Sequence, residues 1–292
     1  MNIGVIIPSN LQKKEYTKPP GLMDKIRSFF SSSSGVEVSR ADILEDLSLV
    51  ICSVPFDNPE KISERCRRKM RSRIRLAFEK EGALPLLEHP KINGLCGLPN
   101  YEFEEVIRKV ALKRFPELLN IIRGVGNLED REVTVTGNSP YLEYAISSLI
   151  TKVKVLNLLL PMDSVAPAEA EQAFEETGIP VHITNDAEVL GRSAIWIRFP
   201  DDHKSFDILP RKYDGIIVDL GAMKIVDTKN RKIFSIVIEF SERIRRKIGF
   251  SILEGWKAGY VESAVIAMCA NMWNMNLAET SLRLGTVLTF IT

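Results

Sequence analysis

Three observations predict that this 292-residue chain is an α/β protein with a doubly wound, mostly parallel sheet. The stretch 131–163 places a β-branched run before a glycine, an amphipathic segment after it and a second apolar run beyond, which is the pattern of a βαβ unit. Short apolar runs then keep alternating with helical segments as far as Leu220, as parallel α/β sheets require. A separate apolar run at residues 2–7 predicts that another α/β domain precedes this sheet.

Residues 1–125 are expected to form this N-terminal α/β domain, the candidate substrate domain. Its apolar runs predict strands over 2–7 and 47–54, and its periodic runs predict helices over 22–30, 59–81 and, with a break near Pro116, 103–122. Residues 84–100 are rich in Gly and Pro and are expected to be a loop. Gly124 and Gly126 mark the expected domain boundary.

Residues 126–250 are expected to form the second domain, with strands over 133–136, 153–160, 181–184, 194–199 and 213–220. Helices are expected directly after Gly137 and over 164–177, and a hairpin or a sixth strand over 225–240. Residues 251–292 are expected to form a helical tail, with helices over 253–273 and 277–284, that packs back towards the N-terminal domain.

The composition excludes several classes of protein. With a net charge of +1 and 26% charged residues, the chain has no global field that would attract nucleic acid or a membrane surface. The four cysteines are far apart and the histidines number three, so no metal site is expected and reduced thiols in a cytoplasm are the simpler account. A signal-peptide pattern is missing from the N-terminus, and no run is apolar enough for a membrane span.

The turn that follows the strand 133–136 is the candidate cofactor site, because ligands of open α/β sheets bind beyond the carboxyl ends of the strands. Gly137 fills the first position of a G-x-G-x-x-G turn, and Ser139 and Leu142 stand where the second and third glycines would be. Asn138 lies within the turn, and Ser139 is placed to cap the helix. Asp163, 26 positions after Gly137, is the candidate to hold a ribose; since no arginine accompanies it, NAD is favoured over NADP.

Asp186 and Arg198 end the third and fourth strands of this domain and complete the candidate cofactor-binding set. For Arg198 two interpretations stay open: it pairs with a phosphate or carboxylate of a ligand, or with Asp201 or Asp202. A cleft is expected between this set and the loop that contains Gly94 and Gly97.

Catalytic residues are unknown from the sequence, with four weak candidates. Cys96 lies in the Gly-rich loop seven residues after His89, and the alternative is a small buried thiol. The other three, Lys257, Tyr260 and Glu262, lie within three turns of one expected helix. There the alternative is a packed helix in which Gly255 and Gly259 allow close contact.

The expected helix 59–81 is unusually basic, with seven cations between Arg65 and Arg75 that are spread around its axis. A solvated helix face is the favoured interpretation, and contact with an anionic ligand or nucleic acid is the alternative. Because no aromatic residue interleaves the arginines, nucleic acid is disfavoured. The expected partner is therefore a small molecule, with no membrane involved, and the sequence leaves a homo-oligomer open.

The order of these elements resembles the shikimate dehydrogenase and methylenetetrahydrofolate dehydrogenase group of amino-acid-dehydrogenase-like proteins. The residues that carry the resemblance are SAIWIRFPDD, YDGIIVDLG and the Asp-x-Gly sequence Asp219-Leu220-Gly221. The resemblance implies a Rossmann domain and NAD(P)-linked hydride transfer, but residues 1–125 offer no match for that group's catalytic lysine and aspartate. The expected function is an NAD(P)-dependent oxidoreductase acting on a small polar metabolite. The alternative is a non-catalytic ligand-binding or regulatory protein on a degenerate Rossmann scaffold.

Overall fold

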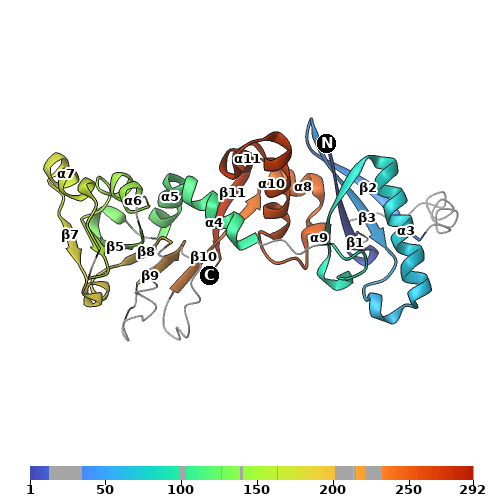
Figure 1. The fold of residues 1–292 in the computed structure, drawn as a ribbon, viewed down its shortest axis with the longest axis horizontal. Helices are drawn as coiled ribbons and strands as arrows, with labels where there is room; N and C mark the ends of the chain where they lie inside the picture. The colour runs from blue at the N-terminus through green and yellow to red at the C-terminus, as the bar shows by residue number, and fades with distance from the viewer. Residues whose placement is uncertain are drawn as a thin grey trace. The chain divides into compact units, whose positions relative to one another are not determined.

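The structure, a computed structural model, describes residues 1–12, 35–98, 103–125, 127–138, 141–162, 164–200, 213, 215–220 and 232–291 (Figure 1). These residues form two compact units. Unit 1 comprises Met1–Phe103 and Ile238–Val287, and unit 2 comprises Glu104–Val237 and Leu288–Thr292. The division of the chain into residues 1–125, 126–250 and 251–292 stays a prediction. The expected helix 22–30 lies outside the described residues.

Unit 1 contains a four-stranded mixed sheet in the order β2-β3-β1-β4. Its strands are β1 (Asn2–Pro8), β2 (Glu37–Leu44), β3 (Leu47–Val54) and β4 (Ala83–Glu88). β1 pairs in parallel with β3 and β4, while β2 runs antiparallel to β3. The apolar runs of β1 and β3 predicted these two strands correctly. The edge strands β2 and β4 were missed, because β2 buries few of its side chains and β4 contains Pro85, a residue that edge positions tolerate.

The basic helix of unit 1 is α3 (Glu64–Glu81), which the Ser63 hydroxyl caps by accepting the Cys66 N–H at 3.3 Å. It ends at Gly82, whose φ of 57° is the left-handed conformation typical of helix ends. The expected start at Pro59 was wrong, because residues 59–61 form the separate 3-10 turn η1 (Pro59–Lys61). Met70, Ile74 and Phe78 make the buried face of α3, so the sequence placed its core stripe correctly.

The C-terminal helices of unit 1 are α8 (Glu242–Ile248), α9 (Phe250–Leu253), α10 (Tyr260–Trp273) and α11 (Leu277–Arg283). α8 contacts β2, and α10 contacts β4. The single helix expected over 253–273 was wrong. Gly255 and Gly259 have φ values of 84° and 76°, and their left-handed conformation separates α9 from α10, so they are not the close-contact face of one helix. Short elements of this unit are α1 (Ser9–Gln12) and η2 (Pro90–Ile92).

Unit 2 begins with α4 (Phe103–Lys113) and α5 (Phe115–Val125), which are interrupted at the break expected near Pro116. The elements of its sheet region are η3 (Leu128–Asp130), β5 (Glu132–Thr136), α6 (Tyr141–Leu149), β6 (Val155–Leu159), α7 (Ala168–Thr177), β7 (Val181–Thr184), η4 (Ala187–Gly191), β8 (Ile195–Arg198) and β9 (Ile216–Asp219). Two strands, β10 (Lys232–Phe240) and β11 (Thr286–Ile291), belong partly to each unit. β11 was not predicted. Of the hairpin or sixth strand expected over 225–240, residues 225–231 lie outside the described residues, and the rest corresponds to β10.

The seven-stranded sheet has the order β11-β10-β9-β8-β5-β6-β7. Each described pairing from β10 to β7 is parallel. Counted from β5, these six strands follow the 3-2-1-4-5-6 order of dinucleotide-binding Rossmann folds. The predicted fold class is therefore confirmed, and the reversal of strand order lies between β5 and β8. In this fold the carboxyl ends of those two strands flank the ligand crevice.

The two faces of this sheet differ in polarity. Thr134 of β5 is the register partner of Asn157 on β6 and of Trp196 on β8, and Asn157 is the partner of His182 on β7. Asn157 Nδ2 donates to the Ser193 hydroxyl at 3.4 Å, and its Oδ1 lies 3.3 Å from His182 Nδ1. The alternate residues of β5 and β6 are apolar and buried. Polar side chains thus cross this sheet in one row that satisfies its own hydrogen bonds.

No helix within the described part of the chain is both long and apolar enough to cross a membrane.

Candidate functional site

The crevice between β5 and β8 is closed by backbone hydrogen bonds. Phe199 N–H donates to the Thr136 carbonyl at 2.7 Å, and Asn138 N–H donates to the Pro200 carbonyl at 3.1 Å. The two strands therefore stay paired for two residues beyond their ends. Gly137 has a φ of 152°, and a Cβ added to it would lie 2.6 Å from the Phe199 Cβ. Its glycine is required by the approach of the protein's own chain.

The turn offers few donors to a diphosphate. Tyr141 N–H and Leu142 N–H both donate to the Asn138 carbonyl, at 2.9 and 3.3 Å, and Asn138 N–H is held by Pro200. Pro140 has no N–H. Backbone N–H groups at a helix start are what normally bind phosphate, and those of Asn138, Tyr141 and Leu142 are engaged within the protein. Ser139 lies outside the described residues, as does Asp163.

An aromatic group lies over the same turn. The Phe199 ring stacks parallel to the Tyr141 ring, with centroids 6.1 Å apart. The Phe115 ring contacts the Phe199 ring edge-on, with centroids 5.2 Å apart. Phe199 is buried. These contacts give Phe199 a packing role at the carboxyl end of β8, beside Gly137.

Arg198 lies at the same edge of the sheet, as the sequence predicted. Its backbone pairs with Thr136 on one side and with Asp219 on the other. The side chain is 4% exposed, and its guanidinium lies 5.0 Å from the centroid of the Trp196 ring. The contact with the indole fixes the position of the buried guanidinium. Asp201 and Asp202, its alternative partners, lie outside the described residues.

Asp186 has a local structural role. Its side chain caps η4 by accepting the Glu188 N–H at 2.8 Å, and its own N–H donates to the Thr184 hydroxyl at 3.0 Å. It is exposed beyond the end of β7. The carboxylate is therefore engaged without a ligand, and cofactor binding by Asp186 stays a prediction.

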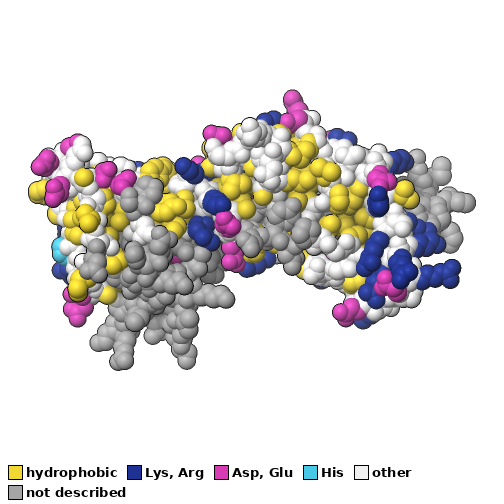
Figure 2. Space-filling model, in the orientation of Figure 1, with side chains coloured by type: hydrophobic (Ala, Val, Ile, Leu, Met, Phe, Trp, Pro, Cys, Tyr) yellow, Lys and Arg dark blue, Asp and Glu magenta, His cyan; other side chains and the backbone are white. Residues whose placement is uncertain are grey.

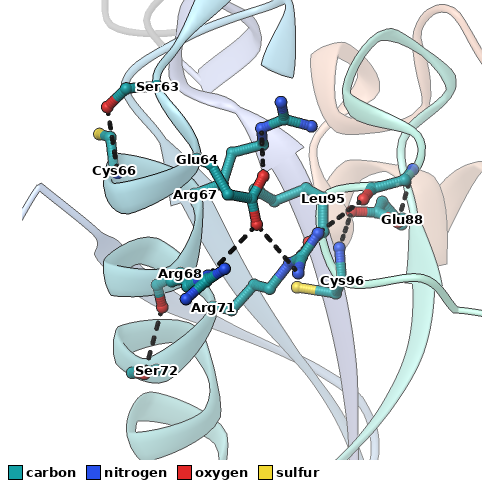
Figure 3. A network of polar contacts seen from close by, with 11 residues as sticks. Ser63, Glu64, Cys66, Arg67, Arg68, Arg71, Ser72, Glu88, Leu95 and Cys96 are labelled. Carbon is teal, nitrogen blue, oxygen red and sulfur yellow. Dashed lines mark hydrogen bonds and ion pairs between the residues drawn. The ribbon is translucent and has the colours of Figure 1, made fainter. Parts of the chain in front are cut away.

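In unit 1, the loop 93–97 is wrapped around the buried carboxylate of Glu88 (Figure 3). Glu88 Oε2 accepts the Gly94 N–H at 3.2 Å, and Oε1 accepts the Cys96 N–H at 2.7 Å. Burial raises the pKa of Glu88, and these amides counteract that rise by stabilising the charged form. Arg71 of α3 secures the far side of the loop by donating to the Leu95 carbonyl.

The surroundings of Cys96 do not favour a nucleophile. Burial, reinforced by the nearby Glu88 charge, raises the pKa of its thiol to about 12, although Arg71 opposes the shift. Both ring nitrogens of His89 are engaged elsewhere: Nδ1 accepts the Lys91 N–H at 3.2 Å, so Nε2 carries the proton and donates to the Glu254 carbonyl at 3.1 Å. Burial also lowers the His89 pKa, which keeps the ring neutral. These contacts favour the alternative of a half-buried structural thiol.

The three C-terminal candidates do not share one helix. Lys257 precedes α10, and its Nζ lies 4.4 Å from the Phe103 ring centroid. The Tyr260 ring stacks on that of Trp256 at 5.8 Å. Glu262 is 7% exposed and accepts the Phe240 N–H at 3.4 Å. Burial raises the Glu262 pKa to about 7, a value suited to proton transfer at neutral pH.

Sequence reasoning missed the Glu88 carboxylate, the polar row through Asn157 and the closure by Phe199. The signals were present for the first two. Glu88 directly follows an apolar run and precedes a Gly-rich loop, and Asn157 interrupts an otherwise apolar strand. The Phe199 contact joins residues more than sixty positions apart, which no local pattern reveals. Within the described ranges, no group of three or more His, Cys, Asp or Glu side chains is arranged to hold a metal ion.

Comparison with known proteins gives distant similarities only. No protein-family model matches the chain, and no curated protein matches its sequence. Among solved structures, it is similar to shikimate 5-dehydrogenase from Listeria monocytogenes in complex with shikimate and NAD, with 10% identity over 74% of this chain and 76% of that chain and a TM-score of 0.28. L-tryptophan dehydrogenase from Nostoc punctiforme shares 12% identity over 97% of this chain and 77% of that chain, with a TM-score of 0.30.

Glutamyl-tRNA reductase from Methanopyrus kandleri shares 12% identity over 77% of this chain and 50% of that chain, with a TM-score of 0.26. Similarities of this size support no conclusion about activity, and the fold assignment rests on the strand order of unit 2.

Proposed function

We propose that this protein is an NAD(P)-dependent oxidoreductase that acts on a small polar metabolite, with its cofactor at the carboxyl ends of β5 and β8. The observation that carries the proposal is the 3-2-1-4-5-6 strand order, whose reversal point lies at Gly137. The buried Arg198 at the same edge adds a fixed cation for a phosphate or carboxylate group.

Within this proposal Asp163 holds the ribose of the cofactor, and NAD is preferred to NADP because no arginine follows it. Dinucleotide binding requires that the turn rearrange, since Pro200 occupies the Asn138 N–H and Phe199 packs on Gly137. Release of the Pro200 carbonyl would free one backbone donor beside the start of α6. The proposed catalytic candidates remain Cys96, Lys257, Tyr260 and Glu262, with Glu262 favoured by its pKa of about 7.

The second candidate function is a non-catalytic ligand-binding or regulatory protein on the same scaffold. The observation that favours it is that the N–H groups of Asn138, Tyr141 and Leu142 are engaged within the protein. Such a turn lacks the donors that hold a diphosphate, whereas Arg198 could still bind the carboxylate or single phosphate of a smaller ligand.

Titration of the full chain with NADH and NADPH, followed by nicotinamide fluorescence, separates the two candidates. The first predicts saturable binding, tighter for NADH, and a Kd at least tenfold higher in Arg198→Gln. Arg192→Gln is the matched control, because it removes an exposed cation from the same unit. A folded sample that binds neither cofactor at millimolar concentration eliminates the oxidoreductase, and a retained small molecule in the native mass spectrum would then support the second candidate.

A further inference from the structure

The helix α3 carries far more charge than its packing explains. Its sequence ERCRRKMRSRIRLAFEKE holds eight cationic and three acidic side chains, and Figure 2 shows the dark-blue Lys and Arg side chains gathered over it. Only Met70, Ile74 and Phe78 are buried. The helix is described throughout its length, so ion pairs of its side chains with other described residues can be identified.

Along one edge of α3, four arginines share two carboxylates, so the charge of this edge is partly neutralised within the protein. Glu64 forms ion pairs with Arg67, Arg68 and Arg71 at 3.3, 3.5 and 4.0 Å (Figure 3). Further along the same edge, Arg75 pairs with Glu79 at 2.7 Å. Arg71 also donates to the carbonyls of the loop 93–97. These arginines are accounted for by the stability of unit 1.

The other edge has cations without acids. Arg65, Lys69 and Lys80 are exposed, and none of them forms an ion pair or hydrogen bond with any described residue. Their spacings of four and eleven residues place all three on one stripe of the helix. Between Lys69 and Lys80, Leu76 is the one large apolar side chain that is exposed on α3.

We propose that the stripe of Arg65, Lys69 and Lys80 binds the phosphate backbone of a nucleic-acid duplex. Fifteen residues of helix extend about 22 Å, so these cations form a row on a convex surface instead of converging on one phosphate. A row of this kind matches a linear polyanion. The net charge of the whole chain disfavoured nucleic acid, but the local charges of α3 decide the field at this surface.

The chemistry of the stripe selects among linear polyanions. α3 has no exposed aromatic side chain on which unpaired bases could stack, so single strands gain nothing beyond their phosphates. A membrane-binding helix presents a broad apolar face to the lipid, and Leu76 alone does not provide one. The contact is therefore with phosphates, independent of base sequence, and this function is separate from the site on unit 2.

The test is fluorescence anisotropy of the full chain with a labelled 24-base-pair DNA duplex of arbitrary sequence between 50 and 200 mM salt. The variant is the triple substitution Arg65→Gln, Lys69→Gln and Lys80→Gln, which preserves helix propensity. Loss of three phosphate contacts should weaken binding at 50 mM salt. Between 50 and 200 mM salt, the factor by which DNA affinity falls should be about 40-fold smaller for the triple variant than for the original protein. Each phosphate contact contributes about −0.9 to the slope of log affinity against log salt concentration.

The matched control removes the same number of charges from exposed positions of unit 2, with Arg131→Gln, Lys154→Gln and Arg192→Gln. The control should keep the original salt dependence. The proposal is overturned by undetectable binding at 50 mM salt, by equal losses in the two triple variants, or by tighter binding to vesicles rich in phosphatidylserine than to the duplex. Circular dichroism of both triple variants is measured first, to confirm that α3 is intact. The binding results of the two variants are compared only then.

Discussion

Two loops that follow buried parallel strands are closed in different ways. After β5, the Gly137 turn is closed by main-chain hydrogen bonds to the end of β8 and by the Phe199 ring. After β4, the loop 93–97 is closed by the Glu88 carboxylate, which accepts the N–H groups of Gly94 and Cys96. Neutral backbone holds the first loop, whereas a buried ionisable group holds the second.

This difference bears on how Gly-rich segments are interpreted. Both segments suggested ligand loops, because glycine allows a backbone to approach a ligand closely. At Gly137 the close neighbour is Phe199 of the protein itself, while a Cβ added at Gly94 or Gly97 would meet no atom within 4 Å. At these two positions the positive φ values of 84° and 67° explain the glycines. The Gly137 turn should therefore resist substitution sterically, and the loop 93–97 should respond to charge.

The largest expected effect comes from Gly137→Ala. The added Cβ would lie 2.6 Å from the Phe199 Cβ, at a φ of 152° that L-residues rarely adopt, so we expect a loss of about 3–5 kcal/mol in the free energy of unfolding. Gly178→Ala is the matched control: it also has a positive φ but open space around it, and should cost about 1–2 kcal/mol. Urea denaturation measures both, and equal losses would mean that Phe199 does not close the turn.

A smaller loss is expected for Glu88→Gln. The glutamine amide offers one oxygen where the carboxylate has two, so one of the N–H groups from Gly94 and Cys96 loses its acceptor, at about 1–3 kcal/mol. The opened loop should also let iodoacetamide reach Cys96 more quickly, as peptide mass spectrometry would show. Glu79→Gln, an exposed ion-pair partner, should cost under about 1 kcal/mol. Unchanged stability together with unchanged labelling would contradict closure by Glu88.

An effect of the opposite sign, a gain in stability that depends on pH, is expected for Glu262→Gln. The buried carboxyl of Glu262, on α10, accepts the Phe240 N–H of β10. Its pKa is raised from 4.5 to about 7. The neutral form is therefore favoured in the folded protein. The protonated Glu262 carboxyl makes its full contribution to the free energy of unfolding below pH 4.5. This contribution is lost as the pH rises through about 7.

Replacement by glutamine should remove this pH dependence and stabilise the protein by roughly 1–3 kcal/mol at pH 8. Denaturation curves at pH 5 and pH 8 provide the measurement. If the variant keeps the same difference between the two pH values as the original protein, Glu262 is not the group that titrates.

The sequence by itself determined most of the strands, the core stripe of α3 and the α/β fold class. These follow from local periodicity: the apolar runs of β3 and β7 were predicted to the residue, and Met70, Ile74 and Phe78 recur at helical spacing. It failed at two edge strands, β2, which buries few of its side chains, and β4, which contains Pro85. It also failed at the α9–α10 break, where two glycines inside an apolar run resembled packing positions.

Only the tertiary structure decided what surrounds the candidate residues. The sequence does not show whether the neighbour of Gly137 is a diphosphate or Phe199. It likewise does not show whether the neighbour of Cys96 is a base or the Glu88 carboxylate. Likewise, only the positions of Glu64 and Glu79 in the structure show which cations of α3 form ion pairs with them. Periodicity reports which face of an element is buried, whereas pKa values, donors and close approaches depend on side chains that are distant in sequence.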